Sequence, residues 1–152
     1  MDDCYIENRI YYHDTDAGGV VYYAAYLKHL EEGRYELCRK NGVDLGAYQD
    51  KGIAFPVVHA EIEYKSPARY GDKIMILTRV EKIGSSSLHF YQEIKKSDCL
   101  LVKAKTVWTC TGKDFLSRSV PDEIRQALLP KVPAGDTPTK GDGNEIRGNH
   151  CR

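Results

Sequence analysis

The sequence predicts an α+β domain in which an antiparallel sheet packs against one long helix. Three observations support this fold class. From Tyr22 onward, the apolar residues recur with helical spacing over about five turns. Four later segments alternate apolar and polar residues, as half-buried strands do, and short turns join them. The chain has 152 residues, which is the usual size of a single domain.

The first strand and the long helix flank the loop DTDAGG. Residues 5–12 (YIENRIYY) alternate loosely, which is typical of a strand that enters this turn. In the helix that follows, Tyr26 and Leu30 fall on the apolar face, and His29 falls on the polar face. Asn41-Gly42 is expected to end the helix, because glycine readily adopts the left-handed conformation found there.

The remaining elements are four strands and two short helices. Residues that favour turns occur in the connections KSPARYGD, KIGSSS and KKSDC, as in a meander of neighbouring strands. Because only one helix is long, we expect it to cover one face of the sheet. The strands are centred on residues 58–64, 74–80, 88–94 and 102–108, and the short helices on 45–50 and 121–129.

The folded domain is expected to span residues 1–130. Residues 131–152 (KVPAGDTPTKGDGNEIRGNHCR) are rich in Gly and contain almost nothing to bury, so we expect a disordered tail. Within the predicted sheet, several apolar residues fall on the outward sides of their strands and indicate oligomerisation. These residues are Met75, Leu77, Tyr91, Leu101 and Val107.

Composition restricts the partners and the compartment. The 22 Lys and Arg residues balance 22 Asp and Glu residues, so no general positive field attracts nucleic acid or an anionic membrane. No segment has the roughly twenty consecutive apolar residues of a membrane span. The five cysteines form no CxxC pair, and the N-terminus MDDCYIENR does not resemble a secretion signal. We therefore expect a cytoplasmic protein with reduced thiols.

The loop HDTDAGGVVYY, residues 13–23, carries two aspartates that could suggest a metal site. A calcium loop of the EF-hand type that starts at Asp14 would need a ligand at Gly18 and a bidentate Glu at Ala25. Neither residue supplies one, and the sequence contains no HExxH motif and no cysteine-histidine cluster. We therefore predict that the loop binds no metal.

Two interpretations of this loop remain open from the residues alone. In the structural one, Asp14 or Asp16 accepts backbone N–H groups in a turn whose dihedral angles Gly18 and Gly19 permit. In the functional one, an aspartate lies beside a helix N-terminus, whose unpaired N–H groups can stabilise negative charge on a carbonyl oxygen. This combination suits the hydrolysis of a thioester, because a thiolate leaves without a general acid.

The segment YYHDTDAGGVVYYAAYLKHLEEGR closely resembles the opening of the hotdog-fold acyl-CoA thioesterases of the YbgC and 4-hydroxybenzoyl-CoA thioesterase group. EYKSPARYGD resembles the same group's second landmark, and the order of elements agrees from Tyr5 to Leu129. The resemblance implies a hotdog fold, in which an antiparallel sheet wraps around one long central helix. It also implies an acyl-CoA substrate, no cofactor besides the coenzyme A of that substrate, and dimers or tetramers with active sites at subunit interfaces.

The resemblance further implies roles for two residues of the loop. Asp16 falls on the family's catalytic carboxylate, which acts as a nucleophile or as a general base toward water. Tyr23 falls on the position whose backbone N–H polarises the thioester carbonyl. The YbgC branch usually has His in place of Tyr23 and Glu in place of His13. These departures leave the acyl preference open, and we expect His13 to face solvent.

Coenzyme A would bring phosphates to a chain without net positive charge, so local donors at turns are candidate contacts. Arg69, Lys82, Ser86 and Ser87 lie in such turns, where guanidinium, ammonium and loop N–H groups can bind phosphate.

Other residues are assigned to the core. Arg34 falls on the apolar face of the helix, where a charge needs a partner, and Glu31 one turn earlier is the expected one. Trp108 is expected to fill the core beside the helix. The cysteines have no paired His or Asp at a readable spacing, so a cysteine nucleophile is unsupported.

Two alternative functions remain. A hotdog dehydratase or hydratase would need a histidine with a second acid at the reacting carbons, and the predicted polar-face position of His29 argues against it. The chain could instead bind acyl-CoA or an acyl carrier without turnover, as a sensor or as a scaffold that contacts lipid-synthesis proteins. The sequence shows no basic face, so nucleic-acid binding is not expected.

Overall fold

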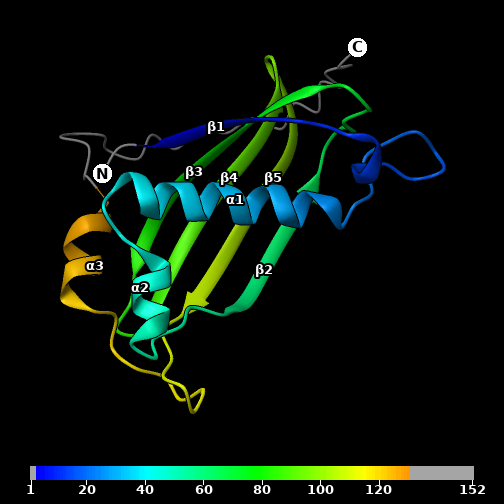
Figure 1. Ribbon diagram of the computed structural model, residues 1–152. Coiled ribbons are helices and arrows are strands. Elements are labelled where there is room, and N and C mark those ends of the chain that lie inside the picture. Colours follow the sequence, from blue (N-terminus) through cyan, green and yellow to red (C-terminus); the bar gives the residue numbers. More distant parts are fainter. Residues whose placement is uncertain (1–2, 131–152) are drawn as a thin grey trace, which may run out of the picture.

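A computed structural model describes residues 3–130 and confirms the predicted α+β fold. Figure 1 shows one antiparallel sheet that curves around the long helix α1, which is the expected hotdog arrangement. The predicted tail, residues 131–152, lies outside the described residues. The helices are α1 (Ala25–Lys40), α2 (Leu45–Asp50) and α3 (Asp122–Leu128), and the strands are β1 (Cys4–Arg9), β2 (Val57–Tyr64), β3 (Lys73–Ile83), β4 (Ser87–Lys96) and β5 (Cys99–Thr109).

The five strands follow the order β1-β3-β4-β5-β2, and each neighbouring pair is antiparallel. β3, β4 and β5 are consecutive in the sequence and are joined by short turns. In the strand order β1 and β2 come first and last, so they form the two edges of the sheet. α1 lies across the inner face, with α2 and α3 beside its C-terminal end (Figure 1). Within residues 3–130, no helix is long and apolar enough to cross a membrane.

The boundaries around the DTDAGG loop differ from the prediction. β1 ends at Arg9, and residues Tyr12–Asp14 form a single 3-10 turn, because the Asp14 carboxylate accepts the Tyr11 N–H at 2.9 Å. α1 begins at Ala25 instead of Tyr22. The Tyr22 N–H donates to the Asp14 carbonyl at 2.9 Å, so Tyr22 belongs to the loop. The helix ends at Asn41-Gly42 as predicted, with Gly42 at φ +77°.

The core consists of two apolar clusters that a buried polar layer separates. The side chains of Thr78, Gln92 and Thr106 come from three adjacent strands and lie under α1. Gln92 donates to the Leu30 carbonyl at 2.8 Å and to the Thr78 hydroxyl at 2.9 Å. Gly33 allows this close approach, since a Cβ there would lie 2.6 Å from the Thr78 hydroxyl oxygen.

Arg34 is buried as predicted, with 6% of its surface exposed, but among residues 3–130 it makes no direct ion-pair contact with Glu31. Burial lowers the pKa of the Arg34 guanidinium, and the charge of Glu31 opposes this shift from a longer distance. The guanidinium donates to the Gln92 amide oxygen at 3.0 Å and lies 5.7 Å from the centre of the Trp108 ring. Glu31 is exposed on the helix, whereas Arg34 turns toward the sheet. Trp108 fills the core beside the helix, as predicted.

Two residues that were predicted to lie exposed on the outward sides of their strands are buried, namely Leu77 and Leu101. Leu101 is 1% exposed and packs in the cluster beneath the N-terminal half of α1. The pairing of β4 with β5 is irregular here, because Ile94 pairs with Val102 and Lys95 pairs with Leu100. Leu101 therefore lies at the bulge, where the alternation of side chains is interrupted. Met75, in contrast, stays 45% exposed on the outer face.

Substituting Gly33 with Ala tests how closely α1 must approach the sheet. The added methyl group would also lie 2.8 Å from the Ile76 side chain, so the helix or the sheet must move. We expect Gly33→Ala to lower the free energy of unfolding by about 1 to 3 kcal/mol, measured by urea denaturation. Gly46→Ala in α2, where the new Cβ meets only the Asp44 side chain at 3.3 Å, is the matched control and should change stability far less.

Candidate functional site

The DTDAGG loop is a small hairpin. Thr15 and Val21 form a bridge between its two arms, and the Asp16 N–H donates to the Val20 carbonyl at 3.0 Å. Gly19 closes the hairpin at φ +76°, a conformation that side chains disfavour. Asp16 therefore lies on the first arm beside the turn, and Tyr23 follows the second arm where the chain enters α1.

The two aspartates of the loop both accept a backbone N–H group, but they differ in exposure. Asp14 is 4% exposed, and its carboxylate accepts the Tyr11 N–H and lies 3.3 Å from His29 Nε2. Asp16 is exposed, and its Oδ1 accepts the Gly18 N–H at 2.8 Å. Among the described residues, nothing contacts Oδ2 of Asp16 by a hydrogen bond or an ion pair. Asp16 is thus the exposed carboxylate of the two, and Asp14 is the buried one.

The start of α1 presents backbone N–H groups that the fold leaves available. The Tyr22 N–H is bonded to Asp14, and the Ala25 N–H donates to the Tyr22 carbonyl at 2.8 Å. Between them, the Tyr23 N–H has no acceptor within residues 3–130. Such a donor at a helix N-terminus favours a partial negative charge on a nearby oxygen.

A pocket of about 270 Å³ adjoins this helix end. It is lined by Val21, Tyr23, Tyr26, Tyr64, Lys65, Ser66 and Pro67. The Tyr64 hydroxyl donates to the Tyr23 carbonyl at 3.0 Å, and the Tyr26 hydroxyl accepts the Ala68 N–H at 3.0 Å. Burial raises the pKa of both hydroxyls, so neither acts as a base near neutral pH. Sequence reasoning missed Tyr26 and Tyr64 because it assigned them to core and strand patterns.

The predicted coenzyme A contacts fall in two places. Arg69 lies beside the loop, where it forms a bridge with Val20. Lys82, Ser86 and Ser87 lie at the β3–β4 turn, at the other end of β3. β3 has 11 residues, so roughly 30 Å separates the two groups. A single chain does not bring them together.

His29 was expected on the solvent side of the helix, and this prediction is wrong. Its side chain is buried, with Nδ1 3.0 Å from the Asn8 amide nitrogen and Nε2 close to Asp14. β1 and the 3-10 turn cover the helix face that the periodicity had assigned to solvent (Figure 1). His13, in contrast, is 76% exposed at its side chain, as expected.

Neither nucleophilic chemistry at the three free cysteines nor a metal site is supported in the described part of the chain. Cys4, Cys38 and Cys110 are free and buried, and burial raises the pKa of Cys38 to about 12. A thiol that stays protonated at neutral pH is a poor nucleophile. No group of three or more His, Cys, Asp or Glu side chains within residues 3–130 is arranged to hold a metal ion.

The profile of the Thioesterase-like superfamily matches residues 11–128. The acyl-CoA thioester hydrolase YbgC of Escherichia coli O157:H7 is 38% identical over 124 residues, which cover 81% of this chain and 87% of that protein. The 1,4-dihydroxy-2-naphthoyl-CoA hydrolase of Nostoc punctiforme is 33% identical over 119 residues, covering 77% and 80%.

Solved structures give the same picture of the fold. Slr0204, a 1,4-dihydroxy-2-naphthoyl-CoA thioesterase from Synechocystis, superposes with a TM-score of 0.78 at 24% identity, over 84% of this chain and 96% of that one. A probable thioesterase from Bartonella henselae superposes with a TM-score of 0.75 at 30% identity, over 79% and 100%.

The raised pKa of Cys38 leads to a testable pH dependence. In the unfolded chain this thiol loses its proton near its ordinary pKa of 9.0, whereas the folded chain holds it to about 12. The contribution to stability is complete below pH 9.0 and is lost as the pH rises toward about 12. We expect Cys38→Ala to flatten the decline of unfolding free energy over this range, and native Cys38 to resist iodoacetamide at pH 8. Rapid alkylation of native Cys38 would contradict this assignment.

Proposed function

This chain belongs to the Thioesterase-like superfamily, and we propose that it hydrolyses acyl-CoA thioesters with Asp16 as the catalytic carboxylate and the Tyr23 N–H as the donor to the thioester carbonyl. One observation carries the assignment of residues. A single loop holds an exposed carboxylate with an uncontacted oxygen and leads into a helix end with an unpartnered N–H. The buried Asp14 of the same motif is already engaged by protein groups.

The proposed reaction consumes a thioester and water and releases a carboxylic acid and a free thiol. Asp16 either attacks the carbonyl carbon, forming an anhydride that water then cleaves, or takes a proton from the attacking water. In both routes negative charge develops on the carbonyl oxygen, where the Tyr23 N–H and the start of α1 stabilise it. The departing thiolate needs no strong acid, and within residues 3–130 no acidic side chain contacts Asp16.

A second copy of the chain would complete the substrate site, and β2 offers the surface for it. Val57, Val58 and Tyr64 on this edge strand are about half exposed. The Lys65 N–H donates to the Leu101 carbonyl of β5. Successive N–H groups of a strand point to opposite sides, so the N–H groups of Ala60 and Ile62 point away from β5, toward the free edge of the sheet. A row of unpaired N–H and C=O groups is suited to pairing with another strand.

Antiparallel pairing of two β2 strands would also explain the separated coenzyme A candidates. The register puts Tyr64 near the loop and Arg69, whereas Val57 pairs with Trp108, which in turn pairs with Leu88 beside Ser87. In such a pair, a two-fold axis relates the two β2 strands, so the β2 strand of the second copy runs in the opposite direction. Its β3–β4 turn, with Lys82, Ser86 and Ser87, then approaches the Arg69 end of the first copy. We propose that coenzyme A binds across this dimer. A tetramer built from two such dimers would keep the same binding site.

Replacing Asp16 with Asn tests the catalytic assignment. Asparagine keeps the size of the side chain and can still accept the Gly18 N–H, but it is neither a nucleophile nor a base. We expect kcat for thiol release to fall about a hundred-fold or more across short, long and aromatic acyl-CoAs. The assay follows free thiol with a disulfide reagent.

Asp50→Asn is the matched control, because Asp50 is an exposed aspartate in α2, far along the chain from the loop. It should retain wild-type turnover. Unchanged turnover in Asp16→Asn would refute the role of Asp16. Acyl-CoA binding by the wild-type protein without any thiol release would favour a binding or scaffold function instead.

Ala60→Pro tests the β2 dimer. The Ala60 N–H points away from β5, so proline removes no hydrogen bond within the subunit, but it blocks pairing with a second β2 strand. We expect wild-type mass, measured by light scattering, at twice 17.2 kDa or a higher even multiple, and a shift toward 17.2 kDa in the variant. Ala60→Ser should keep the assembly. A monomeric wild-type protein with full activity would exclude this interface.

A further inference from the structure

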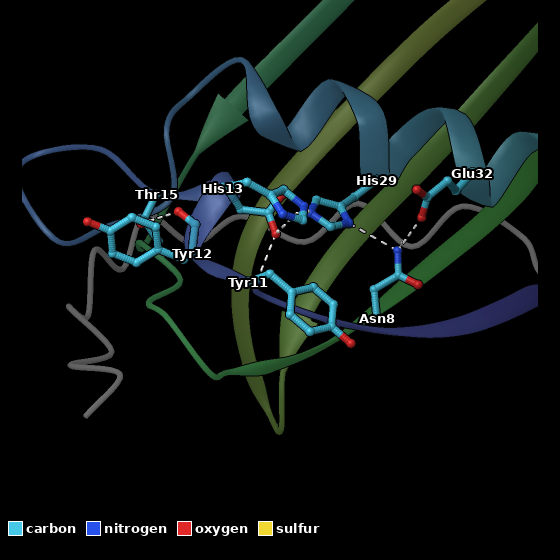
Figure 2. Close-up of polar contacts among 8 residues, drawn as sticks. Asn8, Tyr11, Tyr12, His13, Thr15, His29 and Glu32 are labelled. Carbon is cyan, nitrogen blue, oxygen red and sulfur yellow. Dashed lines mark hydrogen bonds and ion pairs between the residues drawn. The ribbon is translucent and has the colours of Figure 1, made fainter.

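Four polar side chains form a continuous chain of contacts on the side of α1 that faces β1 (Figure 2). Glu32 and His29 come from α1, Asn8 comes from β1, and Asp14 comes from the 3-10 turn before the hairpin. The Asn8 amide nitrogen lies 2.5 Å from a Glu32 carboxylate oxygen and 3.0 Å from His29 Nδ1. None of these four residues has a part in the proposed catalytic step.

The hydrogen bonds among Glu32, Asn8 and His29 determine which nitrogen of the His29 ring carries a proton. A carboxylate only accepts hydrogen bonds, so the end of the Asn8 amide that contacts Glu32 is its NH₂ group. The same NH₂ group faces His29 Nδ1, which must therefore be the acceptor. In neutral imidazole the proton then lies on Nε2. Nε2 faces Asp14 Oδ1 at 3.3 Å.

His29 thus contacts Asp14, the residue whose hydrogen bonds hold the hairpin in place. Nε2 is buried, and in this geometry it is poorly aligned for a full hydrogen bond, with no alternative partner within residues 3–130. Asp14 itself connects the chain before the 3-10 turn with the second arm of the hairpin. Its carboxylate accepts the Tyr11 N–H, and its carbonyl accepts the Tyr22 N–H, the residue just before the proposed Tyr23 donor.

We propose that His29 is a positioning residue, which anchors Asp14 and thereby sets the place of Asp16 and of the Tyr23 N–H. This inference rests on the proposed function of those two residues. His29 acts through the loop and does not touch the substrate, because the pocket of about 270 Å³ beside Tyr23 contains neither His29 nor Asp14 in its lining. Both residues line a different pocket, together with Asn8 and Glu32.

Two variants of His29 separate positioning from simple packing. His29→Phe keeps an aromatic ring of similar shape but removes both polar contacts. His29→Gln offers an amide oxygen to Asn8 and an amide N–H to Asp14. We expect His29→Phe to lower kcat roughly ten- to a hundred-fold with little change in KM, since small displacements of reacting groups cost rate. His29→Gln should recover most of this loss.

Amide hydrogen exchange supplies a readout that does not depend on activity. The Tyr22 N–H donates to the Asp14 carbonyl at 2.9 Å, and we expect this bond to slow its exchange with solvent. Its exchange should accelerate in His29→Phe and slow again in His29→Gln, while amides of β4 stay as protected as in the wild type. Arg39→Ala removes only a surface ion pair with Glu36 near the far end of α1, and it should change neither measurement.

The outcomes distinguish failure of this inference from failure of the proposed function. Wild-type kcat and wild-type Tyr22 exchange in a folded His29→Phe protein would overturn the positioning role, even if Asp16→Asn is inactive. Equal losses of kcat in His29→Phe and His29→Gln would also overturn it, because restoring the polar contacts to Asn8 and Asp14 would then have no effect. If the wild-type chain releases no thiol, the proposed function fails, while the exchange experiment still decides whether His29 anchors the loop.

Discussion

The placement of α1 on the sheet depends on one buried contact, in which Gly33 lets the helix approach Gln92. The Gln92 amide donates to the Leu30 carbonyl and to Thr78, and it accepts from Arg34. Each of these groups is buried, so moving or rotating the helix would leave polar groups without partners at a cost of about 1 to 3 kcal/mol each. A purely apolar interface would specify the position less strictly, because apolar contacts have no direction.

A helix fixed in this way determines the geometry at its N-terminal end. Tyr26 is held by the Ala68 N–H, which ties the helix to the segment between β2 and β3. On the face toward β1, His29 meets Asp14. The hairpin between these two attachments is therefore held where it enters α1, and the exposed Asp16 lies on its first arm beside the turn. The site consists of loop groups that a rigid helix and sheet position, as in many enzymes.

Much of this structure could be predicted from the sequence, and the failures share a physical cause. Alternation and helical spacing gave the strands and the helix, because both follow from local geometry. The residues of the loop alone left Asp14 and Asp16 open, and only the resemblance assigned the catalytic role to Asp16. In the structure Asp14 is buried and Asp16 is exposed, a difference that the local pattern did not predict. Periodicity, however, identifies the faces of a helix without saying what covers them. His29 was assigned to solvent because the packing of β1 over α1 is a tertiary feature, and Arg34 was paired with Glu31 because Gln92 is distant in sequence.

The most direct test of the catalytic geometry is a crystal structure of the wild-type protein with an acyl-CoA analogue in which a methylene group replaces the thioester sulfur. The ketone oxygen should lie about 2.7 to 3.1 Å from the Tyr23 nitrogen, and an Asp16 oxygen about 3 to 3.5 Å from the carbonyl carbon or from a water that contacts it. The coenzyme A phosphates should contact Arg69 of one copy and the β3–β4 turn of the other. A carbonyl bound away from Tyr23, with Asp16 still turned only to Gly18, would contradict the account.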